Sequence, residues 1–216
     1  MQKIKSSEVI LKRLRNANLN QINEPMDNVD LEKDIYQPLD DDIALVFAQE
    51  LNNIGGTFVF CADEKELAAN IKALAKERNW EKLFTKDKAI QHFLDQYQLA
   101  HSDSESDFLQ TQHTITGCEF LIARLGSVLV SSKQYSGRRA NFFPKTHLVV
   151  AHLDQVVPAV KDALVKMYDK YEGRMPSMTT LITGPSRTAD IEKTLVMGMH
   201  GPQELIIFML EEPLKK

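Results

Sequence analysis

The chain has 216 residues, of which 43% are hydrophobic, and this size fits one globular domain with a small extension. Its formal net charge of −4 lacks the basic excess typical of nucleic-acid-binding proteins, so we expect no nucleic-acid partner. No segment is long and apolar enough for a signal peptide or a membrane span, which predicts a cytoplasmic protein.

The cysteine content limits the redox and metal sites that the chain can build. Cys61 and Cys118 are the only two cysteines, and each has apolar neighbours in the sequence. An iron–sulfur cluster and a four-cysteine zinc site both need more thiolates than this. We therefore expect two buried thiols, no iron–sulfur cluster within this chain, no metal site and no cofactor.

The first 40 residues differ in character from the rest. Residues 6–17 predict a short helix with an apolar stripe that includes Val9, Ile10 and Leu14. Residues 18–37 are polar and contain proline, as in a tether. We expect residues 1–40 to form an N-terminal helical and polar extension and residues 41–216 to form the domain.

The next segments alternate helix and strand patterns. A helix is expected to follow Asp40 or Asp41, either of which can cap it, and to end at Gly55. The acidic run at its start is explained by capping, so we predict no metal there. Residues 57–61 predict a buried strand, 63–79 and 86–99 predict helices, and 101–107 predict a polar loop.

The C-terminal half continues this alternation. Gly117 indicates a turn, residues 119–125 a short helix and residues 156–171 a long one. Strands are predicted at residues 127–131, 146–152, 178–183 and 204–210. Short apolar strands between helices predict an α/β fold with a mostly parallel sheet flanked by helices. Ligands of such folds bind beyond the carboxyl ends of the strands.

The stretch "TLITGPSRTADIEKTLVMGMHGPQELIIFML" concentrates polar chemistry between two apolar runs. Gly184 and Pro185 turn the chain after a predicted strand, and residues 189–194 can start a helix. Free amides at such a turn favour an anion, to which Ser186, Arg187 and Thr188 can add side-chain contacts. The alternative is structural: the hydroxyls cap a helix and Arg187 pairs with a nearby acid.

His200 is the candidate catalytic residue of this stretch. It lies in "GMHGP", where flanking glycines, including Gly201, permit close approach of a ligand or another segment. No serine or cysteine nucleophile accompanies it in the sequence. A hydrogen-bonded structural histidine is the alternative, so the catalytic residues stay unknown at this stage.

The motifs "TGPSRTADIE" and "GMHGP" closely resemble the C-terminal signature of the LUD-domain family, in its stand-alone, lactate utilization protein C-like type. Two middle blocks, "ITGCEFLIARLGSVLVSS" and "GRRANFFPKTHLVVAHLDQVV", also look like the family's. The resemblance covers residues 44–210. It implies a fold like that of sugar-phosphate isomerases, CoA-transferases and formyltetrahydrofolate cyclo-ligase. It adds Ser127 and Arg139 to the anion-binding residues predicted at Gly184, Ser186, Arg187, Thr188 and Gly201.

The family resemblance also implies a role in oxidation of L-lactate to pyruvate, together with iron–sulfur oxidoreductase subunits. One departure bears on activity, because Arg124 and Leu125 stand where the family usually has Glu and Thr. The change indicates either a loss of intrinsic activity or a different anionic ligand that Arg124 also contacts.

Three functions therefore stay open at the sequence level. The first is a cluster-free subunit that supports lactate oxidation and binds a small anionic metabolite. The second is an independent enzyme acting on a small phosphorylated or carboxylated metabolite. The third is a non-catalytic sensor or assembly protein whose N-terminal arm docks on a partner. Whether the chain is an enzyme is left undecided.

Overall fold

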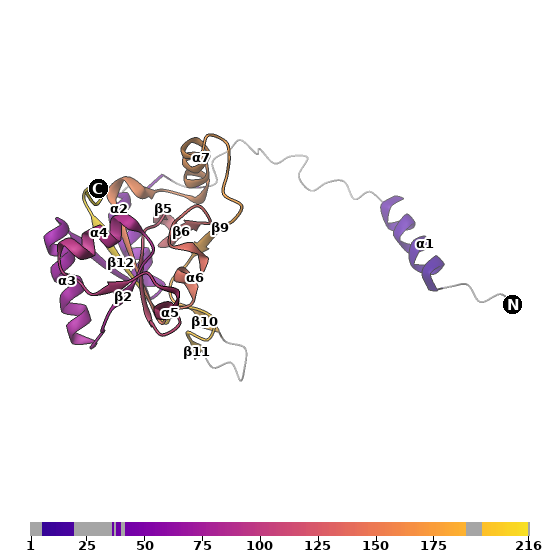
Figure 1. Cartoon of the computed structure of the whole chain (residues 1–216). Coiled ribbons are helices and arrows are strands. Elements are labelled where there is room, and N and C mark those ends of the chain that lie inside the picture. Colours follow the sequence, from indigo (N-terminus) through magenta and orange to yellow (C-terminus); the bar gives the residue numbers. More distant parts are fainter. Residues whose placement is uncertain (1–5, 20–35, 37, 40–41, 189–195, 216) are drawn as a thin grey trace. The chain divides into compact units, whose positions relative to one another are not determined.

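The computed structural model describes residues 6–19, 36, 38–39, 42–188 and 196–215 (Figure 1). The chain divides into two compact units, residues 1–38 and residues 39–216. The boundary predicted between residues 40 and 41 falls on residues outside this description. The predicted start of a helix at 189–194 also lies outside it.

The described part of the first unit is a helix. Helix α1 spans Ser6–Leu19, two residues beyond the predicted end, and Val9, Ile10 and Leu14 are exposed on it. Nearly all of the predicted tether lies outside the described residues. Within the described residues, no helix, α1 included, has the length and apolar character needed to span a bilayer.

A sheet of six parallel strands forms the centre of the second unit and confirms the predicted α/β class. Its strand order is β1-β12-β7-β4-β2-β3. The strands are β1 (Thr57–Cys61), β2 (Leu83–Phe84), β3 (His101–Ser102), β4 (His113–Thr116), β7 (Thr146–His152) and β12 (Glu204–Leu210).

Alternate residues of the central strands point to opposite faces of this sheet. Other elements pack on each face, so both sets of side chains are buried. Along β12, Ile206 and Phe208 pack with helices α3 (Glu64–Glu77) and α4 (Lys88–Gln96). The alternate residues Leu205, Ile207 and Met209 pack with helix α2 (Ile43–Asn53) and with a second sheet. Figure 1 shows α3 and α4 beside the central sheet. The near-continuous apolar run of β12 follows from this two-sided burial.

Aspartate caps fix the starts of α2, α3 and α4. The cap of α2 is Asp42, whose carboxylate accepts from the backbone N–H of Ala44 at 2.8 Å, rather than Asp40 or Asp41 as predicted. Asp63 caps α3 and Asp87 caps α4 in the same way.

The second sheet has the order β8-β5-β6-β9 and is mixed. Its strands are β8 (Val156–Val157), β5 (Phe120–Ile122), β6 (Ser127–Ser131) and β9 (Thr179–Ile182). Strand β6 runs antiparallel to both β5 and β9. One face packs against α2 and the central sheet, and helix α7 (Val160–Lys170) packs with the other. Strand β9 thus lies outside the parallel sheet.

Three further local predictions were wrong. The helix predicted at 156–171 begins only at Val160, because Val156 and Val157 form β8 and pair with β5. Residues 119–125 form β5 followed by a 3-10 turn, η1 (Ala123–Leu125), because Phe120, Leu121 and Ile122 are all buried and an isolated helix turn would expose one of them. The predicted loop 101–107 contains β3 and helix α5 (Glu105–Phe108), whose Phe108 is buried. A further short helix, α6 (Gly137–Phe142), follows β6.

Gly126, which precedes β6, packs against the backbone of α2 and should tolerate no side chain. Its φ is +58°, and an added Cβ would lie 2.3 Å from the backbone nitrogen of Leu51. We expect Gly126→Ala to lower the free energy of unfolding by about 2 kcal/mol more than Gly137→Ala. Gly137 is the matched control, because its φ is +67° but no atom lies within 4 Å of its added Cβ. Urea unfolding measures both, and equal losses would contradict the close packing at Gly126.

Candidate functional site

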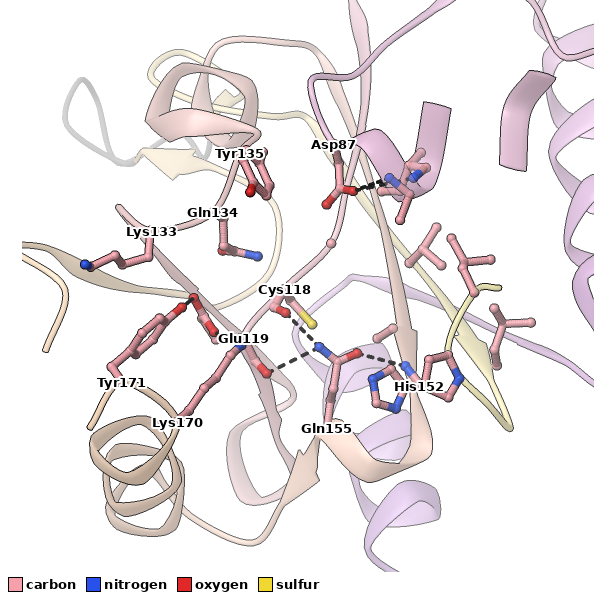
Figure 2. Close-up of a pocket in the computed structure, with 18 residues that line it drawn as sticks. Asp87, Cys118, Glu119, Lys133, Gln134, Tyr135, His152, Gln155, Lys170 and Tyr171 are labelled. Atoms are coloured by element: carbon pink, nitrogen blue, oxygen red, sulfur yellow. Dashed lines mark hydrogen bonds and ion pairs between the residues drawn. The ribbon is translucent and has the colours of Figure 1, made fainter. Parts of the chain in front are cut away.

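The carboxyl ends of the central strands open into a cavity of about 480 Å³. We call it the carboxyl-end cleft (Figure 2). It lies at the position where open parallel sheets bind ligands, and its volume is in the range of small-molecule sites. Polar residues on its wall are Asp87, Glu119, Lys133, Gln134, Tyr135, His152, Gln155, Lys170 and Tyr171.

Glu119 is the centre of the polar wall. Its side chain is fully buried, and it accepts hydrogen bonds from Ser131 Oγ at 2.6 Å, Lys170 Nζ at 2.6 Å and Tyr171 Oη at 2.7 Å. Burial alone would raise the pKa of this carboxyl group, but the three donors outweigh it and hold the pKa below the ordinary value. Glu119 is therefore ionised at neutral pH.

The end of α7 supplies the cation and the phenol that meet Glu119 (Figure 2). Lys170 is the last residue of α7, and Tyr171 caps it. Lys170 is half-exposed, so its ammonium can donate to Glu119 and still offer N–H groups to the cleft. Burial and the neighbouring Glu119 carboxylate raise the pKa of Tyr171 to about 12. Tyr171 is thus a neutral hydrogen-bond donor rather than a phenolate.

Gln155 connects the turn after β4 to the end of β7. Its amide nitrogen donates to the carbonyl oxygen of Cys118 at 2.7 Å, and its amide oxygen accepts from the backbone N–H of His152 at 3.0 Å. Burial lowers the pKa of His152, with only partial opposition from Asp154. Its ring is therefore neutral at pH 7, and it lines the cleft as a possible acceptor for a ligand proton.

Asp87 and Cys118 both line the cleft but differ in their chemistry. One carboxylate oxygen of Asp87 accepts from the N–H of Ala89 at 3.0 Å, which leaves the other available at the cleft wall. Burial strongly raises the pKa of the Cys118 thiol. Cys118 is therefore a thiol without nucleophilic character at neutral pH.

The anion site predicted from the sequence follows β9, whose carboxyl end lies in the mixed sheet rather than at the carboxyl-end cleft. Glu119 was taken as the start of a helix. The usable signal was a carboxylate three residues after the buried strand β4, and a Lys-Tyr pair at the end of a long helix.

The segments around Ser186 and Gly201 do meet, as the sequence suggested. The N–H of Ser186 donates to the carbonyl of Pro202 at 2.7 Å, and its own carbonyl accepts from Gly198. Strand β10 (Arg187–Thr188) pairs antiparallel with β11 (Val196–Met197), so a helix does not follow Gly184 directly. His200 is exposed and precedes the amino end of β12.

The other predicted anion-binding residues have structural contacts. Gly184 has φ +76°, and an added Cβ would lie 2.7 Å from the carbonyl oxygen of Ile54. Ser127 Oγ lies 2.9 Å from Thr183 Oγ1, and Arg139 pairs with Glu105. Gly184, Arg187 and His200 line none of the four best-formed cavities among the described residues. Their role in ligand binding stays a prediction, as do those of Ser186, Thr188 and Gly201.

Arg187 makes a hydrogen bond to the carbonyl oxygen of Ile54, at the C-terminal end of α2. We expect Arg187→Ala to lower the free energy of unfolding by about 1 kcal/mol, because one charge-assisted hydrogen bond at an exposed site is lost. Thermal unfolding measures this loss, and Arg174→Ala is the control, since Arg174 pairs only with exposed Glu172. Equal stability of both variants would show that Arg187 does not stabilise the end of α2.

The geometry places the chain among α/β proteins with a cleft at the carboxyl ends of parallel strands. Residues 45–210 match the family described as the LUD domain, and the chain belongs to this family. The resemblance read from the sequence motifs is thereby confirmed.

Individual relatives are similar in sequence to this chain over part of their length. Proteins named "Lactate utilization protein C" from Geobacillus kaustophilus and Geobacillus thermodenitrificans are each 38% identical over 88 residues, which is 40% of this chain and 37% of theirs. The chain thus matches less than half the length of these curated relatives. A crystal structure of a DUF162 family protein from Deinococcus radiodurans covers 78% of this chain and 96% of its own, at a TM-score of 0.57 and 18% identity, which supports the fold.

Proposed function

We propose that this chain is a cytoplasmic component of lactate utilization that binds a small 2-hydroxy or 2-oxo acid in the carboxyl-end cleft. The observation that carries the proposal is the pairing of Lys170 with the buried Glu119 on the wall of that cleft. The role in lactate utilization is supported by the names of the two Geobacillus relatives.

The cleft offers both kinds of contact that lactate needs. The Lys170 ammonium and exposed Lys133 are cations for a carboxylate. Asp87 and neutral His152 are acceptors for a hydroxyl proton. Because Glu119 fixes the Lys170 ammonium in place, a carboxylate would meet a preorganised donor.

We further propose that the chain supports oxidation of L-lactate to pyruvate alongside iron–sulfur oxidoreductase subunits, and carries no cluster itself. Both of its cysteines are buried, and they do not pair with each other. Two cysteines cannot provide the four ligands of a usual cluster. The electrons of lactate would therefore pass to carriers on partner chains.

Affinity purification from lactate-grown cells tests the partnership. We expect a tagged chain to co-purify with iron and acid-labile sulfide, and the same chain purified alone from a heterologous host to contain neither. A strain that lacks the gene should grow normally on glucose and fail on L-lactate. Normal growth of that strain on L-lactate would overturn the pathway assignment. Stoichiometric iron and sulfide in the lone chain would overturn its cluster-free role.

A further inference from the structure

A second cavity, of about 310 Å³, adjoins the carboxyl-end cleft. Tyr135 lines both cavities and is 74% exposed. Three cations, Lys86, Arg138 and Arg139, line the second cavity together with a single carboxylate, Glu105. We call this second cavity the basic pocket.

Charge is unbalanced in the basic pocket. Glu105 pairs with both Lys86, at 3.3 Å, and Arg139, so two cations share one carboxylate. The contact recorded for Arg138 is a weak one, from its guanidinium to the sulfur of Met178 at 3.9 Å. The pocket therefore has an excess of positive charge and an arginine with donors to spare.

Two of these cations make cation–π contacts with aromatic rings of the pocket. The Arg139 guanidinium carbon lies 4.6 Å from the centroid of Phe108, and Lys86 Nζ lies 5.9 Å from the centroid of Phe84. The two rings are themselves in contact, with centroids 4.7 Å apart. Because the contacts with buried rings already restrict these cationic side chains, they lose little conformational freedom when an anion binds. The pocket is therefore preorganised for an anion.

We propose that the basic pocket binds the phosphate group of a small phosphorylated metabolite. A phosphate monoester has close to two negative charges and three acceptor oxygens, which matches the excess of cations and the planar donors of Arg138 and Arg139. The carbon skeleton of the ligand would lie toward Tyr135, on the side of the carboxyl-end cleft. This site goes beyond lactate binding and does not depend on it.

Calorimetric titration of the full chain with glycerol 3-phosphate and with glycerol tests the proposal. We expect binding of the phosphate ester and no binding of glycerol. Arg138→Ala should weaken the binding of glycerol 3-phosphate about tenfold, because a charge-assisted contact is lost. Arg174→Ala, a change at an arginine paired with exposed Glu172, is the matched control and should leave the affinity unchanged.

Glu105→Gln provides a test in the opposite direction. Removing the carboxylate that competes for Lys86 and Arg139 should tighten the binding of glycerol 3-phosphate several-fold, which loss of folding cannot mimic. Lys170→Met should leave the affinity for glycerol 3-phosphate unchanged. This result would show that phosphate binding in the basic pocket is independent of the lactate site proposed in the carboxyl-end cleft. Unchanged affinity in Arg138→Ala, or weaker binding in Glu105→Gln, would overturn the phosphate site.

Discussion

Replacing Glu119 with alanine is expected to lower the free energy of unfolding by about 3 kcal/mol. The change removes the acceptor of three hydrogen bonds and leaves the hydroxyls of buried Ser131 and partly buried Tyr171 without it. Lys170 is half-exposed and regains water, so the loss stays at the lower end of that for a broken buried ion pair. Urea unfolding at pH 7 measures the effect.

Two further variants separate charge from packing at this position. Glu119→Gln keeps the shape and one acceptor oxygen, so it should cost about 1–2 kcal/mol. Glu172→Ala removes an exposed carboxylate next to Tyr171 and should change stability by less than about 0.5 kcal/mol. If Glu119→Ala proved no more harmful than Glu172→Ala, Glu119 would not organise the cleft wall.

Acidification is expected to destabilise the protein through His147. This side chain is fully buried on β7, and Nε2 lies 2.8 Å from Thr116 Oγ1. Burial lowers the pKa of His147 to about 3, whereas an unfolded histidine titrates near 6.5. Between these two pKa values, His147 therefore binds a proton in the unfolded chain but not in the folded chain. The stability is fully present above about pH 6.5 and falls by about 3 kcal/mol on going to pH 4.

A histidine variant isolates this contribution. His147→Gln should flatten the dependence of unfolding free energy on pH between 6.5 and 4, because glutamine does not titrate. His200→Gln is the control, since His200 is exposed, and should keep the wild-type slope. The remaining slope in His147→Gln should come from His113 and His152, whose pKa values burial also lowers, and near pH 4 from carboxylates such as Glu119, whose pKa is held below its ordinary value. An unchanged slope in His147→Gln would contradict the neutral buried state.

Long apolar runs were the parts of the fold that the sequence predicted well. The strands predicted at 146–152 and 204–210 are parallel strands buried almost throughout. The strand predicted at 57–61 is also parallel, but it lies at the edge of the sheet and only Cys61 is fully buried, since Phe60 is 49% exposed. Strands β2 and β3 were missed because two residues show no periodicity. The assignment of 119–125 to a helix failed because a short apolar segment fits a helix turn and a buried strand equally well.

The candidate site was predicted less well, for a physical reason. The residues around Glu119 come from segments far apart in the chain: Ser131 on β6, and Lys170 and Tyr171 at the end of α7. No local pattern shows that these side chains converge on one carboxylate. By contrast, Ser186 and Gly201 belong to two neighbouring motifs that were assigned to one anion site, and their segments do lie in contact.

The most direct measurement is calorimetric titration of L-lactate and pyruvate into the wild-type chain, Lys170→Met and Arg187→Ala. The carboxyl-end cleft predicts that Lys170→Met weakens binding about tenfold or more, because a charge-assisted contact to the carboxylate is lost. It predicts that Arg187→Ala binds as wild type does. Binding that survives in Lys170→Met and is lost in Arg187→Ala would contradict the cleft and place the ligand at the Gly184–Thr188 turn.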